Sequence, residues 1–359
     1  MNATKVLEEK IGRKIVEQLM NNKPPIIEIP KRFKTNVWFD EKDKVIRMKD
    51  DTFERQMNSL SGIKSFTQTL AVASVIADSL RQKISLTKRD VYYAGGRITI
   101  GKESLFEKQA DSDLIIEDIE VLTGLFREQL GVVAEESGQI VGNIVYETLN
   151  RDGEWIETDC TKVSDPMQTS GRFIKDEEFK IKSIDAKFIL IVEKGGILTK
   201  LFDTKFDKRH NCIMISTKGQ PDRASRYLVK KIHNEYKLPV YMLVDGDPWG
   251  MHIASVWKYG SIRLCYENDR LACPNAKLIG VFPSEIEKYD IKKYEKLDEG
   301  DIRRARRLLS EPWLNCEPEW KKEIELFLKN NKKCEIENLS EHNIRFLTDT
   351  YLPEKLNLK

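Results

Sequence analysis

Residues 188–193 read FILIVE, five apolar residues followed by an acid. Residues 240–245 read VYMLVD and repeat this pattern. Short apolar runs of this length predict buried strands. The neighbouring sequence predicts a helix at 196–205, a strand at 212–216 and a helix at 221–236 with proline in its first turn. Strands that alternate with helices are typical of a parallel sheet with covered faces. We therefore predict an α/β domain in the second half of the chain.

Acidic residues follow both apolar strands. Glu193 and Asp245 are each the first residue after a strand, and Asp247 lies two residues further on. Functional groups collect at the carboxyl ends of parallel strands. Carboxylate oxygens suit Mg²⁺, which usually takes one or two carboxylates together with waters and a phosphate. We interpret the three acids as a magnesium site. The alternative is that residues 245–248 (DGDP) form an ordinary turn, because carboxylates at strand ends are common.

The first half of the chain predicts helices followed by a hairpin. An amphipathic helix over 4–20 and extended segments over 26–47 come first. Apolar spacing then predicts helices at 65–82, 87–94 and 112–130 and a hairpin of 131–134 with 139–146, joined by 135–138. Three helices and a hairpin wing in this order make a winged helix-turn-helix of the CAP-like kind. Residues 87–94 occupy the place of its recognition helix.

The short helix at 87–94 carries a tyrosine pair. Thr87 and Asp90 form a start signal for the helix, and Arg89 and Tyr93 lie four residues apart on one face. Arginine grips phosphate with two hydrogen bonds. A tyrosine hydroxyl has an ordinary pKa of about 10, so as a nucleophile it needs help to lose its proton. A nearby cation gives that help and stabilises charge on phosphorus. The pattern indicates phosphoryl transfer; the alternative is that Tyr92 and Tyr93 are ordinary half-buried aromatic residues.

The composition is that of a chain with more than one packed unit. Its 359 residues are 40% apolar and 33% charged, which is long for a single core. No apolar run approaches the roughly 20 residues that cross a bilayer, and the N-terminus lacks a secretion pattern. We therefore expect a cytoplasmic protein. Its six cysteines include no CxxC pair, which argues against a zinc site or a disulfide framework.

The charge distribution is more informative than the net charge of +2. Basic residues gather beside the tyrosine pair and beside the acids. From these groups we select four candidate DNA contacts, which are Lys88, Lys208, Arg209 and Arg223. The densest basic run is RRARR at 303–307. We interpret this run as a solvated helix face whose charge nearby acids offset.

Longer motifs carry a resemblance to a known family. The segments EKG (193–195) and DGDPWG (245–250) resemble the Toprim signature of topoisomerases and related nucleases. The segment RDVYY (89–93) in a winged helix resembles the catalytic signature that topoisomerase VI A subunits share with their meiotic double-strand-break relatives. Further matching motifs include EIPKR (28–32), KRHNCI (208–213), KGQPDRA (218–224), KYGSI (258–262) and YLPEKL (351–356). The chain departs from the family pattern at 95–105 and at 160–180.

The resemblance implies roles for single residues. Tyr93, the second tyrosine of the pair, would attack DNA with help from Arg89, and Glu193, Asp245 and Asp247 would hold Mg²⁺. It implies a homodimer in which Tyr93 of one protomer works with the metal of the other. Within one protomer we expect Tyr93 to be too far from Glu193 for direct chemistry. Each tyrosine would hold a 5′-phosphate.

The resemblance also implies a partner. The chain has no GxxxxGK[ST] motif and no GHKL-type ATPase pattern; the family uses a separate ATPase B subunit in an A2B2 assembly. The function it implies is that of the DNA-cleaving A subunit of an ATP-dependent type IIB topoisomerase, archaeal in style, that relaxes and decatenates double-stranded DNA. Two alternatives stay open, a recombination-initiating transesterase without strand passage and a non-catalytic winged-helix DNA-binding protein.

The predicted architecture is an α/β multidomain chain, in which a winged helix is followed by a Toprim domain. The predicted parts are an N-terminal helix and strap (1–64), a winged-helix tyrosine domain (65–150), a connector (151–185), a Toprim metal-binding domain (186–290) and a C-terminal helical region (291–359). We expect the protein to be nucleoid-associated and to have no membrane partner.

Overall fold

The computed structural model describes residues 2–100, 103–133 and 137–358. The chain forms two compact units, and each takes a short segment from the other half of the sequence. Unit 1 comprises Met1–Trp38, Met48–Glu135 and Ile262–Glu267. Unit 2 comprises Phe39–Arg47, Glu136–Ser261 and Asn268–Lys359.

Unit 1 begins with the predicted N-terminal helix. It runs as α1 (Ala3–Leu7), a π-helical turn (Glu8–Arg13) and α2 (Lys14–Met20). The extended segments that follow are β1 (Ile26–Pro30) and β4 (Thr52–Gln56) in unit 1. Strands β2 (Val37–Asp40) and β3 (Val45–Met48) lie between them and belong mostly to the segment Phe39–Arg47 of unit 2. Strands β1 and β4 pair antiparallel, and their buried residues Ile27 and Ile29 pack against Phe66. The helix and the extended arm are therefore parts of a packed core.

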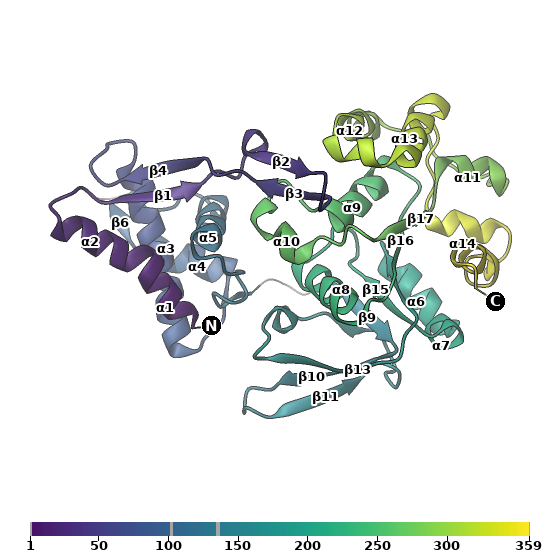
Figure 1. The fold of residues 1–359 in the computed structure, drawn as a ribbon, viewed down its shortest axis with the longest axis horizontal. Coiled ribbons are helices and arrows are strands. Elements are labelled where there is room, and N and C mark those ends of the chain that lie inside the picture. Colours follow the sequence, from purple (N-terminus) through teal and green to yellow (C-terminus); the bar gives the residue numbers. More distant parts are fainter. Residues whose placement is uncertain (1, 101–102, 134–136, 359) are drawn as a thin grey trace. The chain divides into compact units, whose positions relative to one another are not determined.

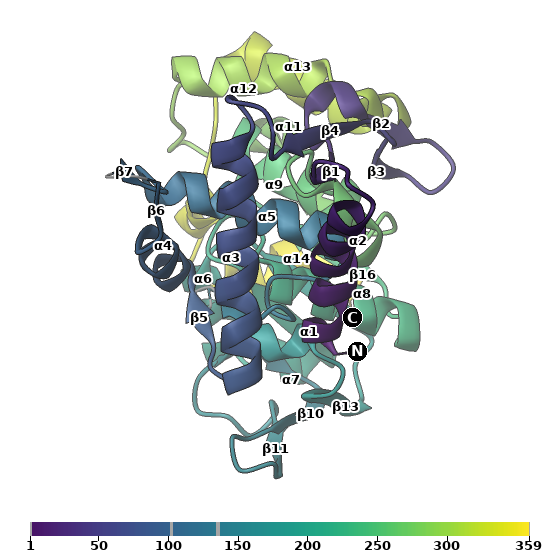
Figure 2. The same ribbon diagram turned by 90° about the vertical axis from the view of Figure 1, so that its left-hand side faces the viewer.

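Three further helices build the rest of unit 1 (Figure 2). They are α3 (Ile63–Gln82), α4 (Lys88–Gly96) and α5 (Gln109–Thr123). Val72 and Ile76 of α3 share one buried core with Val91 of α4 and Ile119 of α5. The predicted helices at 65–82 and 87–94 are confirmed. The third helix was predicted to reach residue 130 but ends at Thr123, because Gly124 has a φ of +70° and caps it.

The predicted hairpin wing at 131–146 is wrong. Residues 134–136 lie outside the described residues, but the strands on either side of them have other partners. Strand β8 (Val132–Val133) pairs in parallel with β5 (Leu86–Thr87), and β9 (Gln139–Gly142) pairs with a strand of unit 2. Both segments are apolar, and apolar alternation predicts a strand without naming its partner. A short hairpin does occur between α4 and α5, formed by β6 (Thr99–Ile100) and β7 (Glu103–Ser104).

Unit 2 is built on a six-stranded sheet of order β12-β9-β15-β14-β16-β17 (Figure 1). Its strands other than β9 are β12 (Met167–Gln168), β15 (Cys212–Ser216), β14 (Phe188–Val192), β16 (Val240–Leu243) and β17 (Lys277–Gly280). The last four of these are parallel. Every residue of β14 and β15 is buried, as expected of strands with both faces covered. The predicted parallel sheet is confirmed.

Helices cover both faces of this sheet (Figure 1). Helices α8 (Arg223–Tyr236) and α9 (Pro248–Tyr259) lie on one side, and α6 (Gly195–Asp203), α7 (Phe206–His210) and α14 (Leu352–Leu356) lie on the other. The remaining helices of unit 2 are α10 (Asn268–Leu271), α11 (Pro283–Lys288), α12 (Glu299–Leu309) and α13 (Pro318–Asn330). Helix α8 begins after Pro221, because the side chain of Asp222 accepts the Ser225 N–H and caps it.

Residues 151–185 were predicted to be an irregular connector, and this is wrong. They contribute two strands of an antiparallel sheet of order β11-β10-β13, formed by β11 (Trp155–Asp159), β10 (Ile144–Leu149) and β13 (Phe179–Ile184). The rings of Tyr146, Phe173 and Phe179 pack together beneath it. Most residues of β13 are exposed or half-buried, so the segment lacks the apolar run that would predict a strand.

Candidate active site

Helix α4 carries the tyrosine pair and is fixed at both ends. The predicted capping box is confirmed: Asp90 N–H donates to Thr87 Oγ1 at 3.1 Å, and Thr87 N–H donates to Asp90 Oδ2 at 2.7 Å. A Cβ atom on Gly95 would lie 2.7 Å from Phe106 Cε2, so the last turn packs too closely for any larger residue. Val91 is fully buried between these ends. These contacts fix which face of α4 meets the solvent.

The two tyrosines have different environments. Tyr93 is 66% exposed, and Arg89, one turn earlier on the same face, is exposed and forms no ion pair with another described residue. Tyr92 packs against the core of unit 1, and its hydroxyl donates to Glu107 O at 3.5 Å. The two rings contact each other, with centroids 5.2 Å apart. Tyr93 therefore presents its hydroxyl to solvent while Tyr92 supports its ring.

Glu193 and Asp245 lie together at the carboxyl edge of the sheet in unit 2. The parallel pairing of β14 with β16 sets Val192 beside Leu243, so each acid follows its strand at the same edge. The N–H of Glu193 donates to Leu243 O at 3.0 Å. The N–H of Asp245 donates to Glu193 Oε2 at 2.9 Å. The two acids therefore lie side by side at the carboxyl edge of the sheet, as predicted.

The carboxylate of Asp245 has two partners of its own. Its Oδ1 accepts the N–H of Ile336 at 2.9 Å, and its Oδ2 lies 2.9 Å from Lys194 Nζ. Lys194 also pairs with Glu337 at 2.9 Å and with Glu335 at 3.3 Å. The ammonium group therefore bridges Asp245 to two exposed glutamates.

The segment around Cys334 holds the turn between Asp245 and Asp247. The backbone of Gly246 exchanges two hydrogen bonds with that of Cys334, at 2.8 and 3.0 Å. A Cβ atom on Gly246 would lie 2.8 Å from Cys334 Sγ, so this position requires glycine. Asp247 in turn caps α9, because its Oδ1 accepts the N–H of Gly250 at 2.6 Å. Hydrogen bonds thus hold the turn on both sides, at Gly246 and at Asp247.

In the structure, the carboxyl groups of Glu193, Asp245 and Asp247 do not converge on one point. Within the described residues, no three acidic, histidine or cysteine side chains surround a common metal position. The physical reason is that Lys194, the residue after Glu193, reaches Asp245 and pairs with it, while Asp247 is turned toward the start of α9. The expectation that all three acids surround one metal position is therefore not met.

The electrostatics of the site nevertheless favour a cation. Burial, reinforced by the charge of Asp245, raises the pKa of Glu193 to about 7. Burial also raises the pKa of Asp245 to about 6, against the Ile336 N–H and Lys194, and it raises the pKa of Asp247, with a contribution from Asp301. Burial and the repulsion between neighbouring carboxylates therefore destabilise the charged forms of these acids. A bound cation would relieve this, and carboxylate oxygens are ligands that suit Mg²⁺.

The four candidate DNA contacts are divided between the two units. Lys88 belongs to unit 1 and pairs with Asp113 at 3.0 Å. Lys208 and Arg209 are exposed on α7, where Arg209 pairs with Asp349 at 3.0 Å. Arg223 is buried at the first turn of α8, which makes it the least accessible of the four. DNA contact by these residues stays a prediction.

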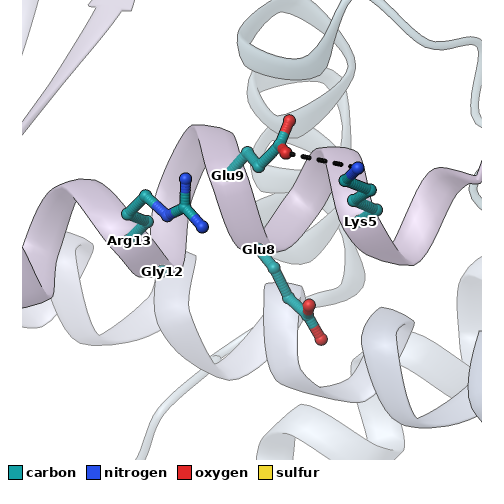
Figure 3. Close-up of a pocket in the computed structure, with 5 residues that line it drawn as sticks. All are labelled: Lys5, Glu8, Glu9, Gly12 and Arg13. Atoms are coloured by element: carbon teal, nitrogen blue, oxygen red, sulfur yellow. Dashed lines mark ion pairs between the residues drawn. The ribbon is translucent and has the colours of Figure 1, made fainter.

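A shallow hollow of about 390 Å³ lies on the N-terminal helix of unit 1 (Figure 3). Its lining is charged and comes from Lys5, Glu8, Glu9, Gly12 and Arg13. Lys5 pairs with Glu9 at 4.0 Å across one turn. None of the predicted site residues lines it, so it is a feature of the helix surface and separate from the acids and the tyrosines.

Sequence reasoning missed the basic residues around the acids. Lys194 lies inside the EKG motif, but no spacing rule indicates that it pairs with Asp245. Lys333, which lies 2.7 Å from buried Asp301, belongs to a segment predicted only as a helical region. Both contacts depend on how distant parts of unit 2 fold together, and no local signal in the sequence predicts them.

Comparison with known proteins assigns this arrangement to a class. The family model for the Toprim domain of the topoisomerase 6 A subunit/Spo11 group matches residues 188–356. The model described as type IIB DNA topoisomerase matches residues 64–132. The chain is thus of the type IIB DNA topoisomerase class, with a Toprim domain in unit 2.

Individual relatives extend this match over nearly the whole chain. The A subunit of the type 2 DNA topoisomerase 6 of Hyperthermus butylicus is 37% identical over 99% of this chain and 94% of its own length. That of Aeropyrum pernix is 35% identical over the same shares. The A subunit of the DNA topoisomerase 6 of Arabidopsis thaliana is 34% identical over 91% of this chain and 74% of its own length. The chain belongs to the family of topoisomerase VI A subunits.

Proposed function

We propose that this chain is the DNA-cleaving subunit of an ATP-dependent type IIB topoisomerase and that Tyr93 is its nucleophile. The observation that carries the proposal is the exposed Tyr93 on α4, one turn from an exposed arginine, beside a Tyr92 whose hydroxyl is already bonded. A nucleophile must reach phosphorus, and an arginine on the same face can hold the phosphate oxygens.

In the proposed step the Tyr93 hydroxyl loses its proton and attacks a DNA phosphorus. A phosphotyrosyl ester forms, and the bond from phosphorus to the 3′ oxygen breaks. The leaving 3′ oxygen takes up a proton and becomes a hydroxyl, and the 5′-phosphate stays on the enzyme. Arg89 stabilises the charge that develops on the phosphate oxygens. Reversal of this step reseals the strand without an external energy source.

We further propose that Glu193, Asp245 and Asp247 hold Mg²⁺. When bound, the metal would stabilise charge on the reacting phosphate and on the leaving oxygen. Lys194 has two other carboxylate partners, Glu335 and Glu337, so it can release Asp245 without losing its own charge compensation. The raised pKa values of the three acids support the assignment, because a divalent cation relieves their repulsion.

Unit 1 is proposed to bind double-stranded DNA as a winged-helix domain, without the wing predicted at 131–146. The order of α3, a tight connection and α4 supports this, because it is that of a helix-turn-helix with α4 as the recognition helix. Lys88, Lys208, Arg209 and Arg223 remain candidate phosphate contacts. The DNA substrate would place the protein on the nucleoid.

The assembly that completes the function is proposed to be A2B2. A homodimer of this chain would cut both strands, since its two-fold symmetry matches that of the duplex. The ATPase would be a separate B subunit, because the chain contains no GxxxxGK[ST] motif. ATP would then drive passage of a second duplex through the break, giving relaxation and decatenation.

The test combines the chain with a candidate B subunit, ATP, Mg²⁺ and supercoiled plasmid. ATP-dependent relaxation is expected, and the Tyr93→Phe chain with the same B subunit should give none. Cleavage and covalent attachment without any relaxation would replace the proposal with a transesterase that does not pass strands. No cleavage by the wild-type assembly would overturn the enzymatic proposal altogether.

In the described part of the chain, no helix combines the length and the apolar character that a membrane span requires.

A further inference from the structure

Helix α12 contains the basic run RRARR, and its arginines have different surroundings. Arg303 pairs with Glu299 at 3.3 Å on the exposed face, as expected of a solvated helix face whose charge is offset. Arg304 makes no ion pair with a carboxylate among the described residues. Its guanidinium lies instead over the ring of Trp249, 4.0 Å from the ring centre. The offset by nearby acids is therefore an ion pair at Arg303 and only a longer-range interaction, with Glu311, at Arg304.

The acids nearest to Arg304 in sequence already have partners. Glu299 pairs with Arg303, and buried Asp301 lies 2.7 Å from Lys333. Arg307, one turn after Arg304, approaches Glu311 at only 3.8 Å. Arg304 and Arg307 are three residues apart and so are neighbours on the helix surface. The pair carries two positive charges, and Glu311 is the carboxylate that acts on both of them.

Trp249 places this pair beside the acidic turn of unit 2. It is the second residue of α9 and lies two positions after Asp247, which caps the same helix. Trp249 is 40% exposed. A guanidinium stacked on an indole keeps its N–H edges free to donate. His252, one turn further along α9, adds no charge at neutral pH, because burial and the charges of Arg304 and Arg307 lower its pKa to about 4.

Like charges held together at a surface imply a ligand of opposite charge. Burial and the charge of Arg307 lower the pKa of Arg304, while the charge of Glu311 acts in the opposite direction. An anion between the two arginines would reduce their mutual repulsion. A simple packing role for Arg304 would be met equally well by an uncharged side chain over Trp249.

We propose that Trp249, Arg304 and Arg307 form a phosphate-binding subsite that holds the DNA backbone next to the acidic turn at Asp247. The subsite rests on the proposed function, since it takes the same DNA that Tyr93 cleaves. Arg304 donates to the phosphate from its place over the indole, Arg307 adds the second charge, and Trp249 orients Arg304. It makes no base-specific contact, so its contribution is independent of sequence.

The experiment measures binding of a short fluorescent duplex to the Tyr93→Phe chain as salt concentration is varied. Arg304→Gln should reduce the slope of log K against log salt by about 1. The ratio of parent to variant affinity should consequently change about fourfold over a fourfold change in salt. Arg304→Lys keeps the charge without the planar stack, so it should retain most of the slope and lose affinity.

The matched control is Arg303→Gln, which removes an equal charge from the same helix where Glu299 already compensates it; its slope should equal that of the parent. Thermal unfolding checks that each variant is folded. If Arg304→Gln and Arg303→Gln have the same slope, the subsite is overturned and the proposed function stands. If the parent chain binds no duplex, both proposals fail.

Discussion

At the residue scale, exposure distinguishes the two tyrosines of α4. Both have the same chemistry, and in the sequence the arginine four residues before Tyr93 is what distinguishes them. In the structure the Tyr92 hydroxyl donates to Glu107 O, while Tyr93 is 66% exposed on the face that carries Arg89. Tyr93 is therefore the more accessible of the two tyrosines, and its hydroxyl is not engaged by a hydrogen bond to Glu107.

Tyr93→Phe should abolish covalent attachment to DNA, because it removes the attacking oxygen. Duplex binding should change little, since binding depends on phosphate contacts. The measurement is recovery of labelled DNA in a denaturing gel together with the protein. Tyr92→Phe is the matched control and should retain attachment. The assignment is wrong by one residue if Tyr92→Phe abolishes attachment and Tyr93→Phe does not.

Lys194 is the second residue whose role the geometry defines. Its ammonium lies 2.9 Å from Asp245 and so competes with a metal for that carboxylate. Lys194→Met should therefore raise Mg²⁺ affinity by about three- to tenfold, equivalent to about 0.7 to 1.4 kcal/mol. Calorimetric titration with Mg²⁺ measures this directly.

The same change should lower stability in the absence of metal, because Asp245 loses its cation. Mg²⁺ should then raise the melting temperature of Lys194→Met more than that of the wild type. Lys200→Met is the control, since Lys200 donates to Ser340 Oγ and not to one of the three acids. Weaker Mg²⁺ binding by Lys194→Met than by the control would exclude competition.

At the scale of elements, local signals predict helix α4 and strands β14 and β16 correctly. The capping box of α4 involves residues three apart, and β14 is a continuous apolar run because helices cover both faces. The contacts that shape the acidic turn are not local. Ile336 and Asp245 are 91 residues apart, and no periodicity in either segment predicts their hydrogen bond. Strands β11 and β13 escaped prediction because they are largely exposed.

The capping box predicts a measurable contribution to stability. Thr87→Ala removes the side-chain oxygen that accepts the Asp90 N–H and should cost about 1 kcal/mol of unfolding free energy. Thr87→Ser keeps that oxygen and should remain close to the wild type. Urea unfolding of both variants checks the difference, and fraying of α4 should lower the cleavage rate of Thr87→Ala as well. Equal stability of the two variants would show that the cap contributes nothing.

At the scale of the whole molecule, each unit contains a segment from the opposite half of the sequence. Segment Ile262–Glu267 belongs to unit 1, where Arg263 pairs with Glu117 of α5 at 2.6 Å and the Tyr266 hydroxyl donates to Glu120 at 2.9 Å. The Glu117 side chain is buried and that of Arg263 is 64% exposed, so loss of Arg263 would leave a buried carboxylate with one cation fewer. Folding of unit 1 therefore depends on a segment from the second half of the sequence, although the tyrosine and the acids remain in different units.

Tyr93 belongs to unit 1 and Glu193 to unit 2. In a dimer, a complete active site can therefore combine the two residues from one protomer or from two. We expect Tyr93 of one protomer to work with the acids of the other, as the family resemblance implies. The decisive sample is a mixed dimer of one Tyr93→Phe chain and one Glu193→Ala chain, purified through two different tags and combined with the B subunit.

Catalysis between protomers places both defects of this mixed dimer in the same site. The other site keeps an intact tyrosine and intact acids, so the mixed dimer should nick one strand of a plasmid and attach covalently to it. Catalysis within a protomer places one defect in each site and leaves no activity. Each parental homodimer should be inactive in either case, which makes the nick specific to the mixed species. A verified mixed dimer that never nicks DNA would show that the tyrosine and the acids act within one chain.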